Sequence, residues 1–187
     1  MSQPLTVIKI GGGLISIAGA LGRVCEVVGS VARQHRIVVV PGGGPFADAV
    51  RDFDRSVGLA PGTAHWMALL AMDQYGLVLT DRIPGAVLVD EAGDVAERLA
   101  DGRVVVLAPS RWLRSADVLP RTWDATSDSV AAFVAGALDA TRLILIKPGT
   151  ALREPVDSCF TSVLPYGMPY AVIGCDRLEE LPRALSD

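Results

Sequence analysis

Residues 5–13 read LTVIKIGGG and residues 37–45 read IVVVPGGGP, so two apolar runs each end in a triple glycine. Both runs have the length and the β-branched composition of buried strands. Glycine at a strand end lets the backbone turn sharply and lets its N–H groups approach an anion. In an open α/β sheet, ligands gather beyond the carboxyl ends of the strands. The two turns therefore predict one anion-binding site, and the alternative is a pair of tight turns that simply need glycine.

Further apolar runs of strand length alternate with helical patterns along the chain. The expected strands are Leu5–Ile10, Ile37–Val40, Ala86–Val89, Val104–Ala108, Leu143–Ile146 and Tyr170–Ile173. The expected helices are Gly19–Gln34, Pro45–Val57, Thr63–Leu79, Asp90–Ala100, Ser127–Ala140 and Asp176–Leu185. This alternation predicts an α/β fold with a mainly parallel sheet and helices on both faces. The sequence has no internal repeat or linker, which favours a single domain over residues 1–187.

The composition narrows the class of protein. Half of the 187 residues are apolar, but no apolar run approaches the roughly 18 residues of a membrane span, so a buried parallel sheet explains the composition better. The amino-terminal residues lack the pattern of a signal peptide, and the three cysteines are widely spaced without a CxxC pair. We therefore expect a reduced, cytoplasmic protein without a zinc site. A net charge of −4 argues against nucleic-acid binding.

Only two of the 17 basic residues are lysines, Lys9 and Lys147, and both lie at the ends of apolar runs. A lysine in such a run has to bring its ammonium group to a polar edge or to a ligand. One interpretation is that each side chain simply reaches the nearest water. The functional interpretation is that two point charges meet in one site.

Other phosphate-binding motifs fit the sequence poorly. No GxxxxGK[ST] motif occurs, which argues against a P-loop protein. Gly42-x-Gly44-x-x-Ala47 matches the loose dinucleotide fingerprint, but residues 11–16 do not, and no acidic residue lies about 20 positions beyond Gly42. A nicotinamide-dependent enzyme is therefore disfavoured.

The segment WDATSDS, residues 123–129, precedes the most regular helical pattern of the chain. Its two acids, Asp124 and Asp128, can serve as helix caps. In the functional interpretation, Asp128 holds the two lysines in place, Asp124 faces an acceptor, and Arg121 reaches the same opening.

Four segments together resemble the ordered motifs of the amino acid kinase superfamily: Lys9–Gly13, Pro41–Arg51, Asp124–Ala132 and Leu143–Lys147. The resemblance implies a three-layer αβα sandwich that uses ATP and Mg²⁺, with no metal site made by the protein alone. It implies catalytic roles for Lys9 and Lys147 at the transferring phosphoryl group, with Asp128 organising both lysines. The remaining contacts that it implies are Gly11, Gly12 and Gly13 for the ATP phosphates, Asp157 for the nucleotide, and Gly42, Gly43 and Gly44 for the acceptor.

Within that superfamily, the short form with TWDATSDSVAA is most similar to kinases that convert an aminomethylfuran-methyl phosphate to its diphosphate in methanofuran or methylofuran synthesis. Such an acceptor carries an amine, a furan ring and a phosphate. Asp124 is expected to pair with the amine, with Asp48 as the second candidate. Trp123 is expected to stack on the furan, and Arg51 or the Gly43–Gly44 turn to take the phosphate.

Two alternatives stay open. One is a uridylate-type kinase. The other is a non-catalytic binding or storage module, which is suggested by the less typical segment after Lys147, where Pro148–Pro155 has no clear periodicity. The family likeness also implies a homodimer or larger homo-oligomer, with Thr63–Leu79 as the contact because this segment is apolar nearly all round. Of the two histidines, His35 is expected at the surface, and His65 in the core, in an interface or at the acceptor.

Overall fold

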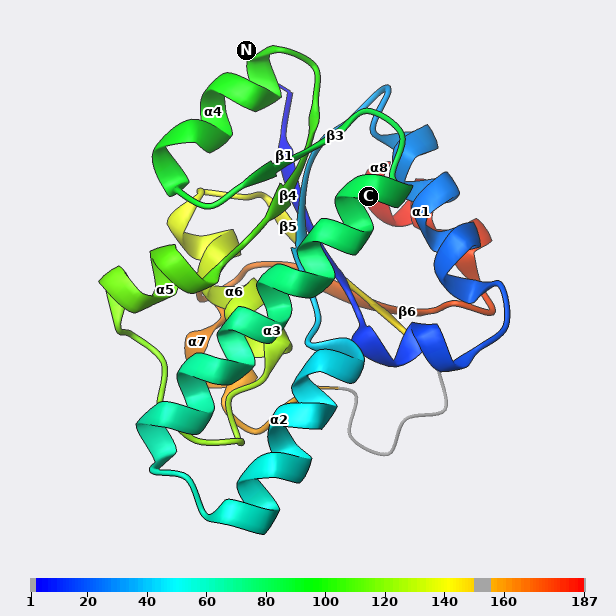
Figure 1. Ribbon diagram of the computed structural model, residues 1–187. Helices are drawn as coiled ribbons and strands as arrows, with labels where there is room; N and C mark the ends of the chain where they lie inside the picture. The colour runs from blue at the N-terminus through cyan, green and yellow to red at the C-terminus, as the bar shows by residue number, and fades with distance from the viewer. Residues whose placement is uncertain (1–2, 150–155, 187) are drawn as a thin grey trace.

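The protein folds around one six-stranded sheet, which a computed structural model shows for residues 3–149 and 156–186 (Figure 1). The strand order is β3-β4-β2-β1-β5-β6, and every neighbouring pair is parallel. The strands are β1 (Leu5–Ile10), β2 (Arg36–Pro41), β3 (Ala86–Val89), β4 (Val104–Leu107), β5 (Arg142–Lys147) and β6 (Tyr170–Gly174). The predicted parallel sheet is confirmed.

Helices follow most strands and return the chain to the start of the next one. The α-helices are α1 (Ala20–Val31), α2 (Gly44–Val57), α3 (Pro61–Arg82), α4 (Ala92–Ala100), α5 (Ser110–Ala116), α6 (Ser127–Ala137), α7 (Phe160–Val163) and α8 (Leu181–Ser186). Two 3-10 helices, η1 (Gly12–Ser16) and η2 (Leu178–Glu180), lie before α1 and α8.

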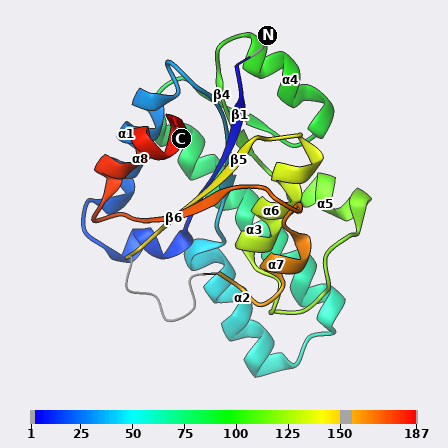
Figure 2. The same ribbon diagram turned by 180° about the vertical axis from the view of Figure 1, so that it is seen from behind.

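Apolar side chains alternate between the two faces of the sheet and form a core on each side. Val7 and Leu145 belong to the core that includes residues of α4, α5, α6 and α7. Ile8 and Ile144 belong to the opposite core, which includes residues of α1 and α8. The two views in Figures 1 and 2 show these helix layers on opposite sides of the strands. The αβα sandwich is therefore confirmed, and its central strands are fully covered.

Helix α3 contributes to both cores and also faces solvent. Leu69 and Met72 pack in the first core, whereas Tyr75 and Leu79 pack in the second. Leu70 and Leu77 on the same helix are more than half exposed. The apolar character of this segment thus reflects two buried contacts and an exposed apolar stripe.

The structure departs from the sequence-based expectation mainly in short elements. Helices α5 and α7 were not predicted, because seven and four residues are too few to show a helical period. The helix expected to end at Ala140 ends at Ala137, and Asp139 then adopts a positive φ of 50°. Part of Pro148–Pro155 lies outside the described residues. None of the described helices is long and apolar enough to cross a membrane.

Candidate active site

The two lysines project from neighbouring strands toward the same helix. Lys9 follows Val7 on β1 by two residues, and Lys147 follows Leu145 on β5 by the same spacing, so both lie on the sheet face that α6 covers. The parallel register places Lys9 opposite Leu145, which is two residues before Lys147 on the same face of β5. Strand alternation and register together therefore bring both side chains to one end of α6.

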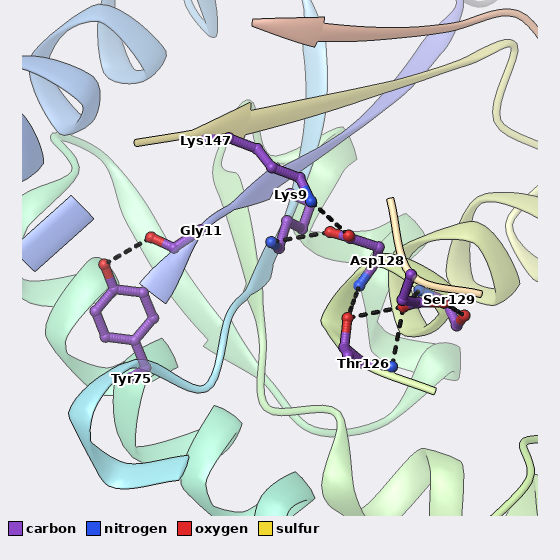
Figure 3. A network of polar contacts seen from close by, with 8 residues as sticks. Lys9, Gly11, Tyr75, Thr126, Asp128, Ser129 and Lys147 are labelled. Carbon is purple, nitrogen blue, oxygen red and sulfur yellow. Dashed lines mark hydrogen bonds and ion pairs between the residues drawn. The ribbon is translucent and has the colours of Figure 1, made fainter. Parts of the chain in front are cut away.

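Asp128, in the first turn of α6, receives both ammonium groups (Figure 3). Lys9 Nζ lies 2.9 Å from Asp128 Oδ1, and Lys147 Nζ donates a hydrogen bond of 2.5 Å to Oδ2. An ammonium group has three N–H donors, so each lysine keeps donors beyond its contact with Asp128. Asp128 and Lys9 are only 3% and 5% exposed, which places this charge cluster inside the protein.

Burial and charge act together on these groups. Burial lowers the pKa of the Lys9 ammonium; the Asp128 carboxylate offsets part of this shift, and Lys147 adds to it. Burial by itself would raise the pKa of Asp128, but Lys9 and Lys147 outweigh it, so the pKa of this carboxyl lies below its usual range. Asp128 is therefore ionised at neutral pH. Each of its oxygens can bind one ammonium group, which offsets the repulsion between the two lysines.

A second acid fixes the start of α6. Asp157 accepts hydrogen bonds from the backbone N–H groups of Thr126, Ser129 and Cys159 at 2.9, 3.0 and 3.1 Å, and from the Thr126 hydroxyl at 2.7 Å. The Ser129 hydroxyl donates to the same carboxylate. Acidic groups near a helix start satisfy free N–H groups and interact favourably with the helix dipole. Asp157 therefore anchors the turn that carries Asp128, and its predicted contact with nucleotide stays a prediction.

The two glycine turns pack directly on each other beside the lysines. A Cβ atom on Gly12 would lie 2.1 Å from Gly44 N, and one on Gly42 would lie 2.5 Å from Gly12 N. Gly44 also has a positive φ of 56°, a conformation that favours glycine. The buried Tyr75 hydroxyl lies 3.5 Å from Gly11 O and donates to it. The glycines thus allow two backbones to approach where side chains would separate them.

Replacing Gly12 with alanine is expected to destabilise the protein by about 1–3 kcal/mol or more, because the new methyl group meets backbone atoms that cannot rotate away. The matched control is Gly22→Ala in α1, where an added Cβ meets nothing within 4 Å. That change should stabilise by about 0.5–1 kcal/mol, because alanine is the better helix former. Urea denaturation of both variants measures the two effects, and equal stabilities would contradict the contact between the turns.

A cavity of about 490 Å³ opens beside the charge cluster and the glycine turns. Most of the predicted site residues line it, namely Lys9, Gly12, Gly13, Gly43, Gly44, Asp48, Arg51, Trp123, Asp128 and Lys147. Arg121 and His65 line it as well. Burial and, to a lesser extent, Arg121 lower the pKa of His65. This volume is in the range of small-molecule sites.

Four predicted residues do not line this cavity. Gly11 and Gly42 lie behind the turns, where their backbone N–H groups donate to Ile146 O and Ile10 O. Asp124 is exposed and accepts a hydrogen bond from the Thr122 hydroxyl, and Asp157 lies at the start of α6. The partly exposed His35 is also away from the cavity.

One charged residue in the cavity wall, Asp54, was not predicted. Asp54 lies on the face of α2 that also carries Ala47 and Arg51, at the i, i+4, i+7 spacing of a helix face. That spacing was readable from the sequence, but α2 carries four more charged residues around it, and only the fold selects one face. Among the described residues, no group of three His, Cys, Asp or Glu side chains is suited to hold a metal ion.

Comparisons with known proteins identify the family that the sequence matches. Residues 4–148 match the amino acid kinase family. The chain is 30% identical over 141 residues to "[5-(aminomethyl)furan-3-yl]methyl phosphate kinase" from Methanocaldococcus jannaschii, a match that covers 74% of this chain and 63% of the relative's length.

Solved structures agree on the fold. A UMP kinase from Ureaplasma parvum superposes with a TM-score of 0.76 at 14% identity, over 97% of this chain and 96% of that one. A uridylate kinase from Archaeoglobus fulgidus superposes with a TM-score of 0.60 at 20% identity, over 83% of this chain and 69% of that one. With its paired lysines and glycine turns inside the matched region, the chain belongs to the amino acid kinase family.

Proposed function

We propose that this protein is an ATP-dependent phosphotransferase that acts on a small phosphorylated acceptor. The observation that carries the proposal is the convergence of Lys9 and Lys147 on Asp128 at the edge of the glycine-lined cavity. Two ammonium groups next to the glycine turns, where η1 and α2 begin, are suited to a polyphosphate such as that of a nucleotide. We further propose that the acceptor is the aminomethylfuran-methyl phosphate, which the M. jannaschii relative is named for.

Phosphoryl transfer depends on alignment and on charge neutralisation more than on covalent chemistry by the protein. In the proposed reaction, an acceptor phosphate oxygen forms a bond to the γ-phosphorus of ATP while the bond to the β–γ bridging oxygen breaks, and ADP leaves. Lys9 and Lys147 neutralise charge on the transferring group, and Asp128 keeps the two ammonium groups at fixed positions. Mg²⁺ that arrives with ATP supplies further positive charge. A phosphate acceptor is already anionic near neutral pH, so no general base is needed.

The decisive experiment combines calorimetry with Mg·ATP and a screen of phosphorylated small molecules for ADP release. The proposal predicts nucleotide binding and ADP release that depends on the aminomethylfuran phosphate. Activity on UMP instead would identify a uridylate-type kinase. Absence of binding at millimolar nucleotide would contradict the proposal and favour a non-catalytic binding module.

The pH profile tests the role of Lys9 in the free enzyme. Because burial lowers the pKa of Lys9, the ammonium loses its proton at a lower pH than an ordinary lysine, whose pKa is about 10.4. If the charged form is active, kcat/KM for ATP should fall as pH rises, with its midpoint below that value. Circular dichroism over the same range separates this loss from unfolding. A profile that is flat up to pH 10.4 in folded protein would contradict the assignment.

We also propose that residues 1–187 form one domain, that the protein is cytoplasmic, and that it is a homodimer or larger homo-oligomer. The exposed apolar residues Leu70 and Leu77 on α3 support the last point, because they lie within the segment expected at the contact. Light scattering should therefore give a mass of at least twice 19.6 kDa. A monomeric mass at micromolar concentration would refute the assembly.

A further inference from the structure

The cavity wall formed by α2 and the loop before α6 contains a linked trio of side chains. Trp123 Nε1 donates a hydrogen bond of 2.8 Å to Asp54 Oδ2. The Arg51 guanidinium lies 4.8 Å from the centroid of the Trp123 ring. All three residues line the same cavity as Lys9 and Lys147. The aromatic ring is thus held in place by an acid on one helix turn and a cation on the turn before it.

The acids that line the cavity differ in how their charge is balanced. Asp128 is paired with two lysines, and Asp48 is paired with Arg51 at 3.1 Å. Asp54 receives only neutral donors, the Trp123 indole and the backbone N–H of Leu59 at 2.9 Å. Across residues 3–149 and 156–186, no Lys, Arg or His nitrogen forms an ion pair with Asp54. It therefore gives the cavity wall a carboxylate that has no ion-pair partner among the described residues.

The Asp54 carboxylate has the capacity to accept further hydrogen bonds. A carboxylate accepts about four hydrogen bonds, and Asp54 receives one on each oxygen. These two bonds fix the orientation of the carboxylate before any ligand arrives. Preorientation of this kind lowers the entropic cost of binding. The position that Asp54 offers is therefore suited to an ammonium group at the far end of a phosphorylated ligand.

We propose that Asp54 is the residue that recognises the cationic amine of the acceptor, with Trp123 as the adjoining aromatic surface. This role of Asp54 rests on the proposed function. The sequence had suggested Asp124 for this role, with Asp48 second. Asp124, however, is exposed outside the cavity lining, and Asp48 already has a cationic partner. The inferred acceptor class is a phosphate monoester that also carries a primary ammonium group. Its phosphate end lies toward the lysines and glycine turns, and its amine lies toward Asp54.

The test compares Asp54→Asn with wild type on two acceptors, the aminomethylfuran-methyl phosphate and its neutral hydroxymethyl analogue. An amide has nearly the same shape and can still accept a hydrogen bond from Trp123 or Leu59, but it carries no charge. For the amine, the KM and the calorimetric Kd should rise about 10- to 100-fold, which is the size of one lost charged hydrogen bond. Both values for the neutral analogue should change less than about threefold, because that ligand makes no ion pair.

The matched control is Asp52→Asn on the same helix, because Asp52 is exposed, pairs with Arg55 and does not line the cavity. It should leave both acceptors unaffected. If Asp54→Asn weakens binding of both acceptors equally, or of neither, the inference is overturned.

Calorimetry separates this inference from the proposed reaction. If wild type binds the amine more tightly than its neutral analogue without releasing ADP, and Asp54→Asn abolishes the preference, Asp54 keeps its role while the kinase proposal fails. If wild type binds neither compound, both the role of Asp54 and the proposed acceptor are overturned.

Discussion

Replacing either Lys9 or Lys147 with alanine is expected to lower turnover about 100- to 1,000-fold, the usual loss when a preorganised charge that acts on a transition state is removed. Both ammonium groups are already held by Asp128 before substrate binds, so little reorganisation is needed during transfer. Steady-state ADP release with saturating acceptor measures the effect on kcat. The loss should appear in kcat rather than only in KM, because the charges act mainly where the phosphoryl group moves.

Arginine should not rescue either position, because a planar guanidinium fork cannot reproduce a compact point charge in a buried site. Arg33→Ala is the control, since Arg33 is exposed and its side chain hydrogen-bonds only the Ser30 hydroxyl among the described residues. It should retain wild-type turnover. Wild-type turnover in both lysine variants would reject the roles assigned here.

Replacing Asp128 with alanine is expected to destabilise the fold by about 3–5 kcal/mol, because removal of one partner leaves buried charges uncompensated. Lys9 is 5% exposed, and no other carboxylate among the described residues pairs with it. Urea denaturation at neutral pH measures the loss. A change below about 1 kcal/mol would show that the lysines find water or another partner instead.

Two variants separate lost charge balance from lost packing. Asp52→Ala removes an exposed, paired acid and should change stability by less than about 0.5 kcal/mol. The triple variant Lys9→Met, Lys147→Met and Asp128→Leu removes the whole ionic cluster. It should regain most of the stability lost in Asp128→Ala, because well-packed apolar groups replace buried ions with little cost. Failure of the triple variant to recover would point to packing around Asp128 instead.

The sequence alone was sufficient for the fold class and for the centre of the site. The runs ending in Gly13, Gly44 and Lys147 predicted parallel strands whose carboxyl ends meet, and a parallel sheet leaves few other arrangements. Strand alternation also determined that Lys9 shares a face with Val7, and Lys147 with Leu145. These inferences succeeded because they depend on local periodicity and on backbone geometry, which are properties of short segments.

Other features required the tertiary structure. Asp157 was predicted to contact nucleotide, and that role stays a prediction. Only the structure shows that its carboxylate also binds the start of α6, about 30 residues earlier in the chain. Asp54 and Trp123 are 69 residues apart, and nothing in either segment signals their hydrogen bond. The sequence alone does not distinguish Asp54, Asp124 and Asp48 as candidates for the amine, because all three are aspartates. Which of them faces the cavity without a cationic partner depends on how α2, α3 and the loop before α6 pack, and that packing is a property of the whole chain.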